Sequence, residues 1–152
     1  MSVVLSWLAG GCVSLRPPAQ TSPPVVSPEG VQVALLGQSC VQLKGRQWPE
    51  ADLVEVRVAV GVQNPTPSPL VVHRDRFRLI APDGTALRPV TWRASEPVTV
   101  APGQQPSFEL RYMTRGGLEC AQPMELAPAT GVMAGDRPLT LAAVRFLPRK
   151  PL

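Results

Sequence analysis

The sequence has little of several residue types on which common protein functions depend. Aromatic residues make up 5% of the 152 residues, and His73 is the single histidine. Surfaces that stack nucleic-acid bases need aromatic side chains, and many acid–base and metal sites need histidine. No GxGxxG, P-loop or HExxH pattern is present either. These shortages argue against nucleic-acid binding, a bound cofactor or metal, and histidine-based catalysis.

Long helices are also unexpected. The chain contains 19 prolines, about one residue in eight, against a usual share of about 5%. Proline interrupts helical hydrogen bonding, and no segment shows ten helical residues with caps. The hydrophobic content of 44% is nevertheless enough for a core. A chain of this length suits one domain.

The clearest element is residues 53–63, LVEVRVAVGVQ. Its valines at 54, 56, 58, 60 and 62 alternate with Glu, Arg, Ala and Gly. At 100° per residue these valines would scatter around a helix, whereas in a strand they share one face. The pattern predicts a long strand at the centre of the fold, with its valine face buried against a second sheet.

Shorter strand patterns and turns surround it. One strand is predicted at 31–35, interrupted at Gly37 and continued at 40–43, and further strands are predicted at 70–72, 77–81, 87–92, 98–100, 108–112 and 139–147. Pro82-Asp83-Gly84-Thr85 and Ala101-Pro102-Gly103-Gln104 are typical of tight turns. Seven or eight short strands separated by such turns predict an all-β, antiparallel sandwich over residues 31–150.

The middle of the chain resembles the immunoglobulin-like domains of unknown function found in secreted bacterial lipoproteins. The resemblance rests on Asn64-Pro65-Thr66 after the valine strand, Phe77-Arg78-Leu79 running into Asp83-Gly84, and Val100-Ala101-Pro102-Gly103 leading into Phe108-Glu109-Leu110. It covers about residues 52–112 and implies an immunoglobulin-like sandwich with an extracytoplasmic role. These motifs mark turns, so they imply no catalytic residues.

The N-terminus resembles a bacterial lipoprotein signal. An apolar run in residues 3–8 is followed by Leu8-Ala9-Gly10-Gly11-Cys12, and about ten apolar residues are too few to span a bilayer. In that family the cysteine receives a lipid and becomes the first mature residue. Two departures are that Ala9 stands three places before the cysteine and that no basic residue precedes Cys12. The alternatives are a cleaved signal without lipid, or a first strand at 3–8 with a free thiol.

On the lipoprotein interpretation, residues 1–11 are a signal peptide and residues 12–30 are a lipidated cysteine with a proline-rich tether. Proline-rich chain is extended and semi-rigid, so the tether would hold the domain away from the membrane. The resemblance implies a lipid-anchored protein of the bacterial cell envelope. Val13 after the cysteine, in place of Asp, favours the outer membrane by similarity to enterobacterial sorting.

The other two cysteines are Cys40 and Cys120. Exported proteins commonly form disulfides, and an odd cysteine count is explained by one modified residue and one pair. We therefore expect a Cys40–Cys120 disulfide, with two reduced or buried thiols as the alternative. No CxxC spacing supports a zinc or redox site.

Weak binding signals come from arginines and tryptophans. The net charge is +4. If residues 74–78 form a strand, Arg74, Arg76 and Arg78 share one face, which is either solvated or a stripe for phosphate or lipid headgroups. Trp48 and Trp92 lie at predicted strand ends, where they either form a binding platform or close the ends of the sandwich.

Catalytic signals are weak. His73 and Asp75 lie two residues apart, with no nucleophile elbow beside them; a surface or turn position for His73 is the simpler interpretation. Asp52 and Glu55 are expected to be solvated.

The sequence thus favours a non-enzymatic envelope lipoprotein that acts as a binding or scaffold module for an envelope protein or assembly, with no small-molecule substrate. The alternative is an accessory lipoprotein of a secretion or pilus assembly machine.

Overall fold

The computed structural model describes residues 15–18, 20–43, 53–90, 96–115 and 118–148. In these ranges the protein is built of antiparallel strands arranged in three sheets, and the one helical element is a 3-10 turn, η1, at Arg74–Arg76. The predicted all-β class is therefore confirmed. The predicted signal segment, Cys12, Trp48 and Trp92 lie outside the described residues.

The longest strands form one four-stranded sheet, which we call the long sheet. Its order is β2-β3-β4-β9, with bounds Val25–Val26, Gln32–Leu43, Leu53–Gln63 and Ser107–Arg115. Strand β4 has the predicted bounds, and its five alternating valines are at most 1% exposed. Burial of each contributes about 1.5–3 kcal/mol before conformational entropy is subtracted.

Strand β3 is longer than predicted. Gly37 does not end it, because the strand continues past a register shift between Leu35 and Gly37. Such a bulge accommodates one extra residue while the ladder resumes on the other side. Strand β3 consequently pairs with β4 along its whole length, from Gln32 opposite Gln63 to Leu43 opposite Leu53.

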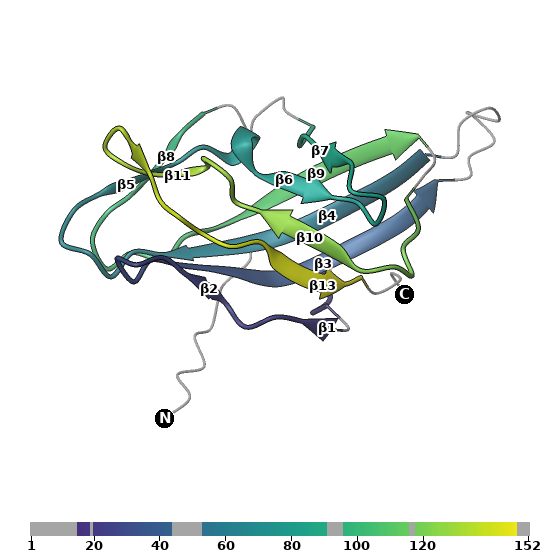
Figure 1. Cartoon of the computed structure of the whole chain (residues 1–152), viewed down its shortest axis with the longest axis horizontal. Coiled ribbons are helices and arrows are strands. Elements are labelled where there is room, and N and C mark those ends of the chain that lie inside the picture. Colours follow the sequence, from purple (N-terminus) through teal and green to yellow (C-terminus); the bar gives the residue numbers. More distant parts are fainter. Residues whose placement is uncertain (1–14, 19, 44–52, 91–95, 116–117, 149–152) are drawn as a thin grey trace.

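The second layer consists of two shorter sheets (Figure 1). One has the order β1-β13-β10-β6-β7, with bounds Gln20–Thr21, Val144–Leu147, Met124–Ala127, Arg78–Ile80 and Ala86–Leu87. The other has the order β12-β11-β5-β8, with bounds Arg137–Pro138, Val132–Ala134, Leu70–Val72 and Val98–Val100. Because β5 leads into β6 and β10 into β11, the two sheets continue one another across a break.

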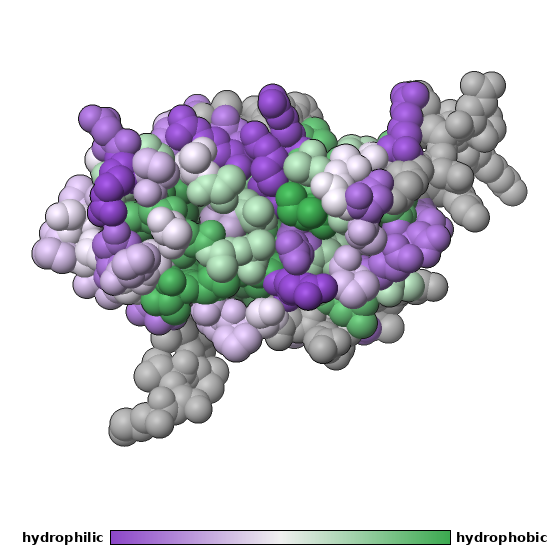
Figure 2. Space-filling model, in the orientation of Figure 1, coloured by the Kyte–Doolittle hydropathy of each residue, from purple (hydrophilic) through white to green (hydrophobic). Residues whose placement is uncertain are grey.

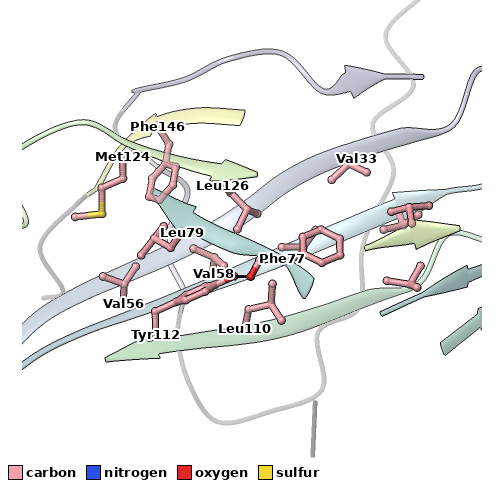
Figure 3. Packing of buried hydrophobic residues seen from close by; sticks show 14 of the residues in the cluster. Val33, Val56, Val58, Phe77, Leu79, Leu110, Tyr112, Met124, Leu126 and Phe146 are labelled. Atoms are coloured by element: carbon pink, nitrogen blue, oxygen red, sulfur yellow. Dashed lines mark hydrogen bonds between the residues drawn. The ribbon is translucent and has the colours of Figure 1, made fainter. Parts of the chain in front are cut away.

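The core lies between the long sheet and this broken layer. Figure 3 shows Val56, Val58, Leu110 and Tyr112 from the long sheet facing a group from the second layer. That group comprises Phe77, Leu79, Met124, Leu126 and Phe146, each at most 2% exposed. The apolar faces of both layers are thus removed from water against each other, as two packed sheets require.

Phe77 occupies the break in the second layer. Its ring packs edge-on to Phe108, with centroids 5.6 Å apart. A Cβ placed on Gly131 would lie 2.6 Å from the Phe77 ring, so only glycine fits there. The backbone N–H of His73 donates to the carbonyl oxygen of Gly131 at 2.7 Å, and this bond links the two chain segments that pass through the break in the second layer.

The last part of the chain differs from the prediction. The final strand begins at Val144 and not at residue 139, while β10 and β11 were not predicted. The strands are accordingly more numerous than seven or eight, because the break divides two of them and short pairs were missed. The predicted turns at 82–85 and 101–104 are confirmed, with Gly84 at φ 87° and Gly103 at φ 78°.

The folded domain also begins before residue 31, which corrects the predicted tether. β1 pairs with β13 and β2 pairs with β3. Further upstream, the backbone N–H of Gln38 in β3 donates to the carbonyl oxygen of Arg16 at 2.9 Å. The described residues from Leu15 onward are therefore attached to the sheets.

Candidate functional site

The predicted disulfide is present. Cys40 and Cys120 are bonded, with Cα atoms 5.6 Å apart, and they are 1% and 8% exposed. Cys40 lies in β3 directly opposite the inward-facing Val56, and Cys120 lies in the segment between β9 and β10. The bond therefore fastens the long sheet to the chain entering the second layer. Its closed loop spans 80 residues, which corresponds to about 4.5 kcal/mol of stabilisation in the chain-entropy model.

The three candidate arginines do not lie on one strand face. Arg74 and Arg76 belong to η1, and Arg78 begins β6. Their guanidinium groups donate to carbonyl oxygens of different segments: Arg74 to Glu96 at 3.4 Å, Arg76 to Thr130 at 3.5 Å and Arg78 to Asp75 at 2.7 Å. The premise of a strand at 74–78 is wrong, because the chain turns there to bring Phe77 into the core.

These arginines still contribute to a polar border of the molecule. Figure 2 shows hydrophilic residues gathered along the upper edge, over η1. Each guanidinium group donates to a carbonyl oxygen of the protein's own main chain, so these side chains are held around the turn.

His73 lies immediately before η1, with extended backbone angles of φ −97° and ψ 94°. Its main-chain N–H bonds to Gly131 as described above, and the residue is partly exposed. This agrees with the interpretation of His73 as a turn residue.

An ionic cluster that was not predicted from the sequence lies on the outer face of the long sheet. Glu55 is 8% exposed and was expected to be solvated. Its Oε1 lies 2.6 Å from Nε of Arg57, and its Oε2 lies 2.6 Å from Nη2 of Arg111. Arg57 and Arg111 are directly opposite each other on β4 and β9. Glu55 thus bridges two like charges that would otherwise repel.

A weaker contact extends this cluster. Nη1 of Arg57 lies 4.0 Å from Oε1 of Glu109, whose side chain is 42% exposed. The alternation of Glu and Arg on the polar faces of 53–63 and 108–112 is the signal that could have found the cluster. It becomes readable only once the register of β4 against β9 is known.

Asn64 was predicted only as part of a turn, but it is a buried polar centre. It is 0% exposed. Its Nδ2 donates to the carbonyl oxygens of Ser68 at 2.8 Å and Val100 at 3.0 Å, and its Oδ1 accepts from the backbone N–H and hydroxyl of Thr66. Both the Nδ2 donor and the Oδ1 acceptor of Asn64 are therefore satisfied, and their hydrogen bonds hold β4, the proline-rich turn and β8 together.

Among the described residues, three ionisable groups have shifted pKa values. Burial raises the pKa of the Tyr112 phenol, partly opposed by the nearby charge of Arg78. The hydrogen bond from the Arg137 side chain lowers the pKa of Glu29. The backbone N–H of Thr85 lowers the pKa of Asp83. Each shift follows from a structural contact, so none of them marks a reactive centre by itself.

Metal-binding and membrane-spanning features were sought in the same residues. Over the described ranges, no three His, Cys, Asp or Glu side chains form a group that could hold a metal ion. In those ranges no helix has the length and apolar character needed to cross a membrane.

Comparison with known proteins gives no family. No protein-family model matches the chain, and no curated protein matches it. What the protein does must therefore be inferred from its own residues and their geometry.

Proposed function

We propose that this protein is an exported envelope lipoprotein whose single β-sandwich acts as a non-enzymatic binding or scaffold module. The observation that carries the proposal is the Cys40–Cys120 disulfide. Disulfides persist in the periplasm and outside the cell, whereas cytosolic thiols are kept reduced. A buried bond that fastens two layers of a small domain is a structural disulfide of this kind.

The cysteine that is not part of the disulfide supports a lipid anchor. With Cys40 and Cys120 bonded, Cys12 is left over, and it follows Leu8-Ala9-Gly10-Gly11 after an apolar run. An odd cysteine in an exported chain needs a separate explanation. Lipid attachment at Cys12 supplies one and accounts for the apolar run before it.

The strand order supports an immunoglobulin-like sandwich. That fold places strands A, B and E in one sheet and G, F and C in the other. Here β3, β4 and β9 correspond to A, B and E, and β13, β10 and β6 to G, F and C. One difference is that the disulfide joins β3 to the segment before β10, where antibody domains join B to F.

A binding or scaffold role agrees with how the polar residues are used. The ionic cluster around Glu55, the Asn64 centre and the arginines around η1 all bond to the protein's own groups. Such contacts give a rigid body with fixed edges and surfaces. Immunoglobulin-like modules commonly bind partner proteins through such surfaces, and an exposed sheet edge is one available mode.

The test is the intact mass of the protein purified from bacterial membranes. We expect a chain that begins at Cys12 with an added lipid mass and with two hydrogens missing at Cys40 and Cys120. A Cys12→Ala variant is the matched control and should be recovered without lipid and outside the membrane fraction. A full-length, unmodified wild-type chain with three free thiols would overturn the proposal.

A further inference from the structure

One side of the sandwich is closed by the beginning of the chain. We call this side the N-terminal edge and define it as residues 15–18, β1, the connection at 22–24, and β2. The carbonyl oxygen of Arg16 bonds to the backbone of β3, β1 pairs with β13, and β2 pairs with β3. The segment crosses between the two layers and so covers the open side of the core.

The first described residue lies tightly against the sheet. A Cβ placed on Gly37 would be 3.1 Å from Cβ of Leu15 and 3.4 Å from the carbonyl oxygen of Arg16. The bulge in β3 falls at this same place. A glycine at the bulge thus admits the incoming chain, and Leu15 is already held against the sheet.

This attachment leaves almost no chain between Cys12 and the fold. Cys12 stands three residues before Leu15, and three fully extended residues span at most about 11 Å. A free proline-rich tether over 13–30 would instead reach about 56 Å. A lipid on Cys12 would therefore sit close to the point where the chain joins β3.

The side chains of the N-terminal edge suit the polar region of a bilayer. Of the large hydrophobic side chains that the structure describes, that of Val26 is the most exposed, at 55%. Arg16 lies on the same edge, and the carbonyl oxygen of Arg145 in β13 accepts a hydrogen bond from the backbone N–H of Ser22 on that edge. An exposed apolar side chain and an arginine on one edge are both suited to the headgroup level, because an arginine stem can cover apolar surface while its charged head stays in water.

We propose that the N-terminal edge lies on the membrane surface and that the opposite edge of the sandwich points into the aqueous space. The inference rests on the proposed lipid at Cys12 and adds the orientation of the domain. β1 and β7 are the two outer strands of one five-stranded sheet, so about 19 Å separates them. Figure 1 shows β1 and β2 along one side of the molecule and β7 on the other.

The experiment uses the full lipidated protein in phosphatidylcholine vesicles that carry a nitroxide quencher on the headgroup. A fluorophore is attached at either of two exposed positions through Pro23→Cys or Ala86→Cys. Pro23 lies on the N-terminal edge, and Ala86 lies on β7. We expect quenching about twofold stronger at position 23 than at position 86, because collisional quenching does not extend over the width of the sheet.

A flexible Gly/Ser segment inserted between Val13 and Ser14 is the control, and it should abolish the difference. Equal quenching at the two positions in the vesicle-bound wild-type chain would overturn the orientation while leaving the anchor intact. A chain that does not bind vesicles would overturn the anchor, and with it this inference. A difference seen only after anionic lipid is added would contradict the short connection as its cause.

Discussion

The phenol oxygen of Tyr112 in β9 donates a hydrogen bond of 3.1 Å to the carbonyl oxygen of Phe77, which lies in the opposite layer (Figure 3). Both residues are 0% exposed. The bond joins the long sheet to the second layer at the point where that layer is broken. It satisfies a carbonyl that the break removes from regular strand pairing.

Replacement of Tyr112 by Phe tests this bond. We expect the free energy of unfolding to fall by about 0.5–1.5 kcal/mol, because the Phe77 carbonyl oxygen loses the phenol donor and keeps only the longer contact with Nη1 of Arg78 at 3.5 Å. Urea titration followed by circular dichroism measures the loss. Ser107→Ala, at an exposed position on the same strand, is the control and should change stability by less than about 0.5 kcal/mol. A Tyr112→Phe protein as stable as wild type would show that the bond is unimportant.

Gly131 should not tolerate even a methyl group. We expect Gly131→Ala to lower stability by about 1–3 kcal/mol, because the new Cβ would fall 2.6 Å from the Phe77 ring and force that ring to move. A double-mutant cycle with Phe77→Leu measures the coupling. If the clash is the cause, the two losses are strongly non-additive. Additive losses would instead point to an effect on the backbone of Gly131.

The Cys40–Cys120 disulfide should contribute a large share of the free energy of unfolding. We expect the Cys40→Ser, Cys120→Ser double variant to lose about 2–5 kcal/mol, as is typical for native bonds in small exported domains. Urea titrations with and without dithiothreitol measure this. The reductant should destabilise the wild-type chain and leave the double variant unchanged. A wild-type midpoint unaffected by reduction would contradict the expectation.

Glu55 and Glu109 should differ sharply, although both lie on the outer face of the long sheet. We expect Glu55→Gln to cost about 1–3 kcal/mol, because Arg57 and Arg111 then face each other without a bridging anion. Glu109→Gln, which removes an exposed contact at 4.0 Å, should stay within about 0.5 kcal/mol of wild type. Urea titration at low and high salt measures both. Equal losses would show that burial of Glu55 has no special effect.

The pair Glu29–Arg137 sets a pH dependence. Its hydrogen bond holds the pKa of Glu29 below the ordinary value of 4.5, so the folded state is favoured above that value. The contribution is lost as the pH falls through the lowered pKa. We expect Arg137→Gln to raise the pKa of Glu29 toward its ordinary value, as measured by NMR of the carboxyl carbon. Arg145→Gln, which removes the partner of Glu125, should leave it unchanged.

Local patterns were sufficient for part of the fold. Five alternating valines predicted β4 with its observed bounds, because a strand with one buried face needs no knowledge of its partners. The turns at 82–85 and 101–104 were equally readable, since each contains a glycine that adopts positive φ. The strand predicted at 77–81 is also present, as β6 at Arg78–Ile80.

What was missed depends on contacts between distant segments. Strands β10 and β11 are short and separated by a turn, and they exist because β6, β13 and β5 offer them partners. Residues 74–78 have an alternating pattern, yet η1 forms there so that Phe77 can enter the core. Glu55 is bonded to Arg111, which is 56 residues away in the sequence. The N-terminal strands β1 and β2 were hidden because proline-rich composition alone resembles a free linker.

The pairing of β1 with β13 has a mechanical consequence. Gln20 is opposite Leu147, so β1 begins where β13 ends. A pull applied between the two ends would first release the contact of Arg16 with Gln38 and would then open the β1–β13 pair one rung at a time, and not by shear. Past that weak outer pair, the covalent link from Cys40 to Cys120 stops extension of the 80-residue segment it encloses. Under load, the β1–β13 pair would therefore separate, while the segment closed by the Cys40–Cys120 disulfide could not extend.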